Sequence, residues 1–205
     1  MKHTKLLFSL LIFTIVLLTV SGILYNRLSD LADTQQLVTM EPARESAAPA
    51  PETSPNAPAE EEPSTVPAPD FTVFDKDGNE VKLSSYIGKP IILNFWASWC
   101  GPCQMEMPDF QAAYEDLGEE IHFLMINMTD GSRETVETAS AFVEENAYSF
   151  PVFFDTSYEA ANLYGAYSLP TTYLIDAEGY AVAQAKGAID GETLRRAISE
   201  LFGIQ

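Results

Sequence analysis

The hydrophobic and polar positions divide the last two thirds of the chain into short strands that alternate with helices. Continuous apolar runs between turn residues are typical of buried strands, and apolar positions three or four residues apart are typical of helices. The predicted strands cover 71–74, 81–83, 90–96, 121–127, 152–154, 171–176 and 180–185. The predicted helices cover 101–117, 132–146, 157–164 and 191–202. This alternation, closed by a hairpin and a helix, predicts an α/β fold with three layers around a mixed β-sheet.

Turn and cap residues set the borders of several elements. Asp77-Gly78 predicts the turn of the first hairpin, and Gly118 predicts the end of the first helix, which we expect to kink at Pro108. Ser132 is the predicted N-cap of the second helix, with Glu134 in its first turn.

The N-terminal region has a different pattern. An uncharged, largely apolar run at 6–25 follows Lys2 and Lys5 and is long enough to cross the ~30 Å hydrocarbon core of a bilayer. We expect 1–28 to be a transmembrane anchor, with a cleaved signal peptide as the alternative. Lysines before the run and acidic residues after it predict a single-pass protein of the cell membrane, with the rest of the chain extracytoplasmic.

Residues 29–69 are rich in Pro, Ala and Glu and have few large apolar side chains, which predicts a disordered linker to a folded domain at 70–205. The whole chain has 30 acidic and 11 basic residues and a formal net charge of −19. This balance argues against nucleic-acid binding, which needs a basic surface. It also implies that a partner bound electrostatically would present positive charge.

The chain has two cysteines, Cys100 and Cys103, where an apolar strand passes into a helix. A disulfide between them closes a short loop, stabilises the fold little, and suits reversible exchange. At the helix N-terminus, unpaired N–H groups and the macrodipole favour the thiolate of Cys100, which makes it the predicted nucleophile. Cys103, one turn further on, is the predicted buried resolving thiol. Pro102 falls in the first turn, where its missing N–H costs nothing.

Other uses of the two cysteines remain open from the residues alone. A static disulfide is one, a thiol-dependent peroxidase is another, and a metal- or heme-handling module with two thiol ligands is a third. A four-ligand zinc site lacks its second ligand pair, and Gln104 stands where covalent heme attachment needs histidine. We interpret His122 and Trp96 as structural residues.

The segment from Trp99 to Cys103, with Gly101-Pro102 between the cysteines, resembles the active-site motif of the thioredoxin superfamily. Ser168 to Asp176 is similar to the strand that this superfamily opens with a cis-proline. The Cys-x-x-Glu-x-Pro pattern from Cys103 to Pro108 resembles the membrane-anchored TlpA/ResA type of thiol–disulfide oxidoreductase. The resemblance covers about 69–202.

This resemblance implies a thioredoxin-like fold with an N-terminal hairpin and a central helix–strand insertion between 133 and 154. It implies that Pro170 is cis and lies against the disulfide, and that Leu169, Pro170 and Thr171 bind the client. Trp99, Gly101 and Pro102 would support the site. Glu106 would exchange protons near Cys103, because Asn94 stands where thioredoxin has an aspartate.

The implied activity is that of a monomeric protein-disulfide reductase with no cofactor beyond the Cys100–Cys103 disulfide and no metal. Its partners would be disulfide-containing client proteins and a membrane dithiol electron donor. Members of this type serve cytochrome c biogenesis, among other processes, and nothing in the sequence selects one client.

Overall fold

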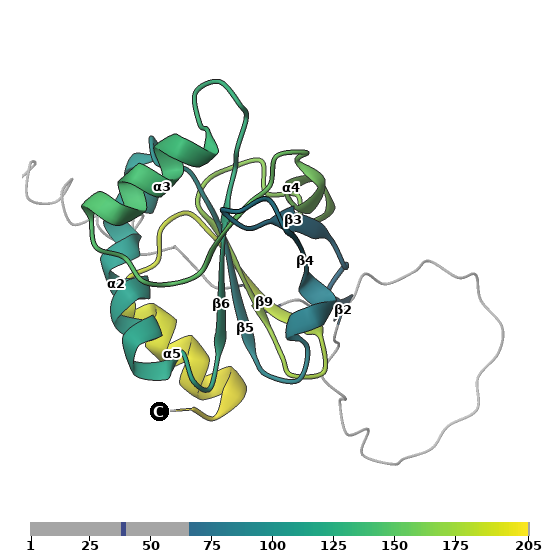
Figure 1. The fold of residues 1–205 in the computed structure, drawn as a ribbon. Helices are drawn as coiled ribbons and strands as arrows, with labels where there is room; N and C mark the ends of the chain where they lie inside the picture. Colours follow the sequence, from purple (N-terminus) through teal and green to yellow (C-terminus); the bar gives the residue numbers. More distant parts are fainter. Residues whose placement is uncertain (1–37, 40–65, 205) are drawn as a thin grey trace, which may run out of the picture. The chain divides into compact units, whose positions relative to one another are not determined.

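The computed structural model describes residues 38–39 and 66–204 (Figure 1). The predicted anchor at 1–28 and most of the linker at 29–69 lie outside these residues. Among the helices of the described part, none is both long and apolar enough to cross a membrane.

Nine strands of the described part form one mixed sheet in the order β1-β9-β8-β5-β6-β7-β3-β4, and β2 also pairs with β9. The pairs β5–β6 and β6–β7 are parallel, and the other pairs are antiparallel. The strands are β1 Val38–Thr39, β2 Val66–Pro67, β3 Thr72–Phe74, β4 Glu80–Lys82, β5 Ile91–Trp96, β6 His122–Asn127, β7 Val152–Phe154, β8 Thr171–Ile175 and β9 Tyr180–Lys186.

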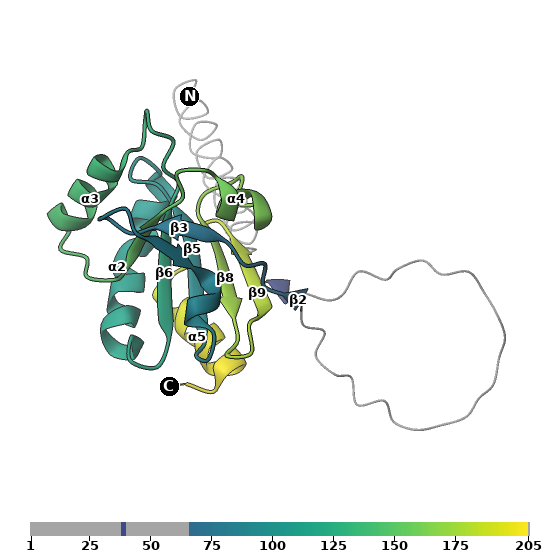
Figure 2. The ribbon, with the colours of Figure 1, turned by 45° about the vertical axis from the view of Figure 1, so that its right-hand side comes forward.

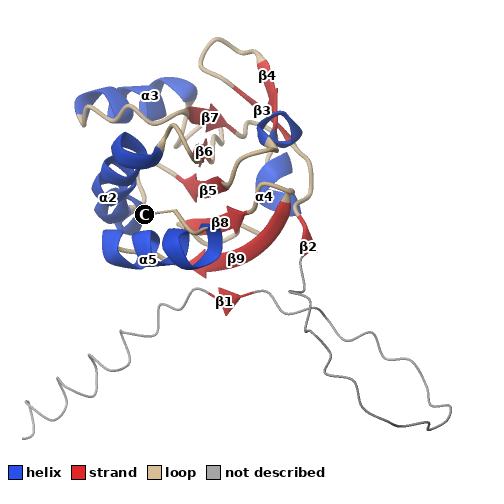
Figure 3. Cartoon of the chain, turned by 90° about the horizontal axis from the view of Figure 1, so that it is seen from below, coloured by secondary structure: helices blue, strands red, loops and turns tan. Residues whose placement is uncertain are grey.

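Helices cover both faces of this sheet, which gives the three predicted layers. Figure 3 shows α2, α3 and α5 on one face and α4 on the other. The helical elements are the 3₁₀ helix η1 Leu83–Tyr86 and the α-helices α2 Gly101–Leu117, α3 Val136–Glu145, α4 Glu159–Leu163 and α5 Gly191–Phe202. The β3–β4 hairpin and the α3–β7 insertion lie where the sequence predicts them.

The centre of the sheet is strand β5, whose six residues are all buried. Its side chains alternate between two cores, as they must in a strand covered on both faces. Trp96 packs with Phe110 of α2 in one core, and Leu93 packs with Tyr164 in the other. Burying an aromatic or aliphatic side chain contributes about 1.5–3 kcal/mol. The buried side chains of β5 and α2 therefore hold the segment 97–100 between them in a fixed position.

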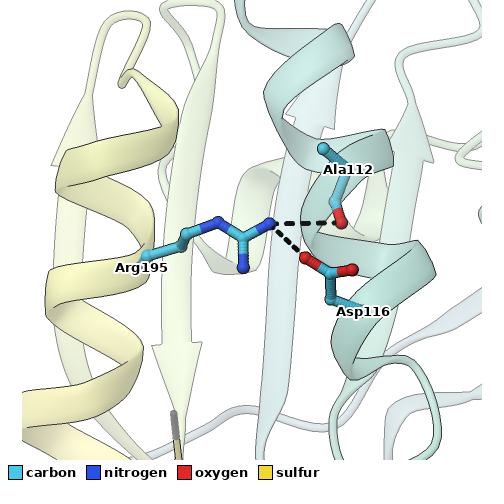
Figure 4. A network of polar contacts seen from close by, with 3 residues as sticks. All are labelled: Ala112, Asp116 and Arg195. Carbon is cyan, nitrogen blue, oxygen red and sulfur yellow. Dashed lines mark hydrogen bonds and ion pairs between the residues drawn. The ribbon is translucent and has the colours of Figure 1, made fainter.

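A polar contact also joins α2 to α5 (Figure 4). Arg195 donates to the Asp116 carboxylate at 2.6 Å and to the Ala112 carbonyl at 3.3 Å. The two charged side chains are 44% and 61% exposed, and an exposed ion pair contributes only about 0–1 kcal/mol. The apolar core therefore holds α2 in place.

The predicted start of the second helix is wrong. Helix α3 begins at Val136, and its N-cap is Thr135, whose hydroxyl accepts from the Thr138 N–H. Ser132 lies in a turn before the helix, because the Asp130 carboxylate accepts hydrogen bonds from the N–H groups of Ser132 and Glu134. An aspartate that bonds the following backbone in this way favours a turn over a helix.

Two short segments within the range 29–69 form strands. Val38–Thr39 and Val66–Pro67 both form antiparallel pairs with β9, and Figure 2 shows β2 beside that strand. The reason is that the outer edge of β9 presents unpaired N–H and C=O groups, which accept further strands. The sheet therefore includes residues before position 70.

Candidate functional site

Cys100 and Cys103 are joined by a disulfide where β5 leads into α2. Cys100 is the N-cap of α2, and its sulfur accepts a hydrogen bond from the Cys103 N–H at 3.2 Å. Cys100 is 5% exposed and lines a cavity, whereas Cys103 is completely buried. The structure therefore gives the two cysteines the unequal access that the sequence predicts.

The cavity beside Cys100 has a volume of about 600 Å³. Its lining includes residues 99–102 and also Tyr158, Tyr167 and Leu169. Trp99 is 42% exposed and Tyr167 is 80% exposed. Two large aromatic surfaces in water beside a reactive sulfur suit the binding of another polypeptide.

Pro170 directly precedes strand β8. The Leu169–Pro170 peptide bond is cis, and Leu169 lines the cavity. The Pro170 carbonyl accepts a hydrogen bond from the Gly187 N–H at 2.9 Å. The Thr171 side chain is buried, and its hydroxyl donates to the Ser168 carbonyl. The client contact predicted for Leu169, Pro170 and Thr171 runs through the backbone and stays a prediction.

Glu106 is a buried carboxyl group one helical turn after Cys103, with 2% of its surface exposed. Its two oxygens accept hydrogen bonds from the Asn94 side-chain amide at 2.8 Å and from the Ile189 N–H at 3.0 Å. Burial raises the pKa of Glu106 to about 7, although these two hydrogen bonds act in the opposite direction. A group with this pKa can accept and release a proton near neutral pH.

Asn94 suits either protonation state of Glu106. Its amide nitrogen donates to Glu106 and to the Thr172 hydroxyl at 3.0 Å, and its amide oxygen has no partner among the described residues. A 180° turn of the amide would present that oxygen to a protonated Glu106, which needs an acceptor. Asn94 does not titrate, but its amide group can form a hydrogen bond with Glu106 in either protonation state.

In the described part of the chain, no group of three or more His, Cys, Asp or Glu side chains is arranged to hold a metal ion. His122 is half-buried and packs edge-on against Tyr86, with the ring centroids 5.1 Å apart.

A second buried carboxyl group, Glu134, lies in the loop before α3, whereas the sequence predicts it in the first turn of a helix. It is completely buried and accepts hydrogen bonds from the Ser98 N–H at 2.7 Å, the Ser98 hydroxyl at 2.6 Å and the Asn127 amide at 2.6 Å. Ser98 lies two residues before Cys100. Glu134 therefore joins the reactive segment to the end of β6 and the loop before α3.

Glu134→Ala is expected to lower the free energy of unfolding by about 3 kcal/mol, because it leaves the half-buried donors of Ser98 and the buried amide of Asn127 without this acceptor. Chemical denaturation of the oxidised protein measures this loss. Glu144→Ala, which removes an exposed glutamate from α3, is the matched control and should change stability by less than about 0.5 kcal/mol. Equal stability of the two variants would show that the Glu134 contacts do not hold this segment.

Arg133 is another residue that the motifs did not reveal. Its guanidinium carbon lies 3.8 Å from the centroid of the Trp99 ring, and it lines the cavity beside Cys100. A guanidinium over an indole face is a favourable cation–π arrangement, worth about 0.5–1 kcal/mol at an exposed site.

Residues 65–183 match the AhpC/TSA family. The thiol-disulfide oxidoreductase ResA of Bacillus thuringiensis subsp. konkukian is 34% identical over 137 residues, which are 65% of this chain and 76% of that protein.

Two solved structures show the same fold. The exposed lipoprotein thioredoxin Etrx1 of Streptococcus pneumoniae aligns with a TM-score of 0.57 and 30% identity, over 65% of this chain and all of that chain. StoA of Bacillus subtilis aligns with a TM-score of 0.55 and 27% identity, over 64% of this chain and 97% of that chain. These likenesses confirm that the domain has a thioredoxin-like fold.

Proposed function

We propose that this chain, which belongs to the AhpC/TSA family and is a thiol–disulfide oxidoreductase like its ResA relatives, reduces disulfide bonds in client proteins through Cys100 and Cys103. The observation that carries this proposal is the unequal access of the two linked cysteines. One lines an open cavity at the start of α2, and the other is completely buried behind it.

The proposed reaction has two exchange steps. In the reduced protein, the Cys100 thiolate attacks one sulfur of the client disulfide, which forms a mixed disulfide and releases a client thiolate. The Cys103 thiolate then attacks the Cys100 sulfur and releases the second client thiolate. Two electrons pass from the enzyme dithiol to the client, each released thiolate takes up a proton, and the enzyme ends in the disulfide form described above.

Glu106 is the proposed proton acceptor for the second step. Cys103 is buried, so its proton has no direct route to solvent, and Glu106 is the carboxyl group one turn along the same helix face. As a carboxylate near pH 7, Glu106 takes the proton from Cys103 and generates the resolving thiolate. Hydrogen bonds from the Asn94 amide and the Ile189 N–H hold the Glu106 carboxylate in position for this step.

Continued turnover needs an external dithiol to reduce the Cys100–Cys103 disulfide again. We assign this role to a dithiol donor in the membrane, which fits a chain tethered there by residues 1–28. The supporting observations are the uncharged run at 6–25 and the name of the pneumococcal neighbour as an exposed lipoprotein thioredoxin. Cys100 and Cys103 both belong to the active-site motif. We therefore propose the apolar run, and not a lipid-modified cysteine, as the tether. The catalytic domain is then extracytoplasmic.

Two measurements on the full chain test this proposal. Redox titration is expected to give a reduction potential close to that of thioredoxin, about −270 mV. In intact cells treated with an impermeant reductant, a membrane-impermeant maleimide is expected to label Cys100, and the Cys100→Ser variant serves as the control without label.

A potential near about −120 mV, the value for a strong oxidant, would contradict the reducing direction. Labelling that occurs only after cell lysis would contradict the extracytoplasmic location while leaving the exchange chemistry in place.

A further inference from the structure

The cavity beside Cys100 holds one charged side chain in a strongly acidic protein. The lining residues are aromatic, apolar or uncharged except for Arg133, in the part of the chain that the structure describes. Arg133 is exposed, and its guanidinium covers the face of Trp99, which directly precedes Cys100. A positive charge therefore lines the cavity through which a client disulfide must approach Cys100.

The backbone around Arg133 is held by hydrogen bonds on both sides. Glu134 is bonded to Ser98 and Asn127, and the Asp130 carboxylate accepts from the N–H groups of Ser132 and Glu134. The position of Arg133 over Trp99 is thus built into the loop before α3 and does not depend on the long side chain alone.

The stacked guanidinium retains its capacity to bind an anion. Stacking uses the flat face of the group, whereas its N–H donors lie along the edge and match the two oxygens of a carboxylate. The ion pair found among the described residues joins Arg195 to Asp116, so Arg133 has no carboxylate within ion-pair distance there. Asp130 lies near Arg133. The pKa of Asp130 is lowered mainly by the hydrogen bond from the Glu134 N–H and less strongly by the charge of Arg133. The Oδ1 atom of Asp130 already accepts this hydrogen bond from the loop backbone.

We propose that Arg133 makes the cavity selective for client segments that carry an aspartate or glutamate side chain next to the disulfide cysteine. The inference rests on the proposed function and adds a specificity-determining residue to it. The domain as a whole repels acidic proteins, so the preference concerns one local carboxylate in a client that is otherwise neutral or basic. In this proposal the client segment lies over Pro102 and Tyr167. Its carboxylate contacts the N–H edge of the Arg133 guanidinium, and its disulfide sulfur meets Cys100.

Two cyclic disulfide peptides that differ only in Glu or Gln directly before the first cysteine provide the test. The measured quantity is the ratio of their second-order rate constants for reduction by the reduced full-chain protein. The expected ratio is about five in favour of the Glu peptide at low ionic strength, which corresponds to the upper end for an exposed ion pair. It should fall toward one in 0.5 M salt, which screens exposed charges, and in the Arg133→Gln variant.

Arg196→Gln is the matched control, because it removes the same charge from α5 and Arg196 does not line this cavity. It should retain the wild-type ratio. An unchanged ratio in Arg133→Gln would overturn the inference, as would an equal slowing of both peptides, which would mean that Arg133 only supports Trp99. If the wild-type protein reduces neither peptide, the proposed function fails and the preference fails with it.

Discussion

Cys103→Ser is expected to leave the protein covalently joined to its clients through Cys100. The variant can still attack a client disulfide, but it lacks the thiol that releases the mixed disulfide. Non-reducing electrophoresis of the full chain from intact cells should show these adducts, and mass spectrometry of the purified bands identifies both the clients and the attached cysteine. The same variant should lose multiple-turnover reductase activity.

Cys100→Ser is the matched control for the trap. It removes the sulfur that lines the cavity and leaves the buried one, so neither adducts nor reductase activity should remain. Adducts that persist in Cys100→Ser and vanish in Cys103→Ser would reverse the assigned roles.

Glu106→Gln is expected to slow the release of a preformed mixed disulfide by about a hundredfold at pH 8, the lower range for the loss of a general base. In the wild-type protein, the release rate should rise with pH through about 7, where Glu106 becomes a carboxylate, and then level off. The variant should lack this inflection. Single-turnover stopped-flow measurements of client release across pH 5–9 give both curves.

Glu120→Gln, on an exposed glutamate beyond the end of α2, is the matched control and should keep the wild-type pH profile. A pH profile of Glu106→Gln that coincides with the wild-type profile would show that Glu106 has no part in proton transfer.

The same raised pKa makes a prediction for stability. The folded protein holds the Glu106 proton up to about pH 7, whereas the unfolded chain releases it near 4.5. The stabilisation from this proton is thus present below pH 4.5 and is lost as the pH rises through 7, by about 3 kcal/mol in total. The stability of oxidised Glu106→Gln relative to wild type should increase by about that amount over this pH interval, and denaturant titrations at several pH values measure it.

Local signals were sufficient to predict the elements that carry the motif. The run of β5, buried throughout and apolar except for Asn94, is typical of a strand covered on both faces. Helix α2 has Pro102 in its first turn and Gly118 after its last residue. The bounds of α2 and α5 agree with the predicted ranges. The unequal access of Cys100 and Cys103 followed from the same local geometry.

Contacts between distant residues explain what the sequence could not reveal. Glutamate is a residue type typical of the first turn of a helix, so the local sequence predicts a helix at Glu134. Its contact with Ser98, 36 residues earlier, depends on the tertiary fold. Ser132 is a good capping residue, but Asp130 two residues before it forms the turn that excludes it from the helix. The pairing of Val38–Thr39 with β9 depends on an open strand edge, which no local pattern encodes.

The most direct test is the alkylation of the reduced full chain by iodoacetamide at pH 7, with the rate at each cysteine followed by mass spectrometry. Cys100 is expected to react at least about tenfold faster than Cys103, because a helix N-terminus favours its thiolate and the other sulfur is buried. Equal, slow rates at both cysteines would contradict the claim that one accessible thiolate starts the reaction.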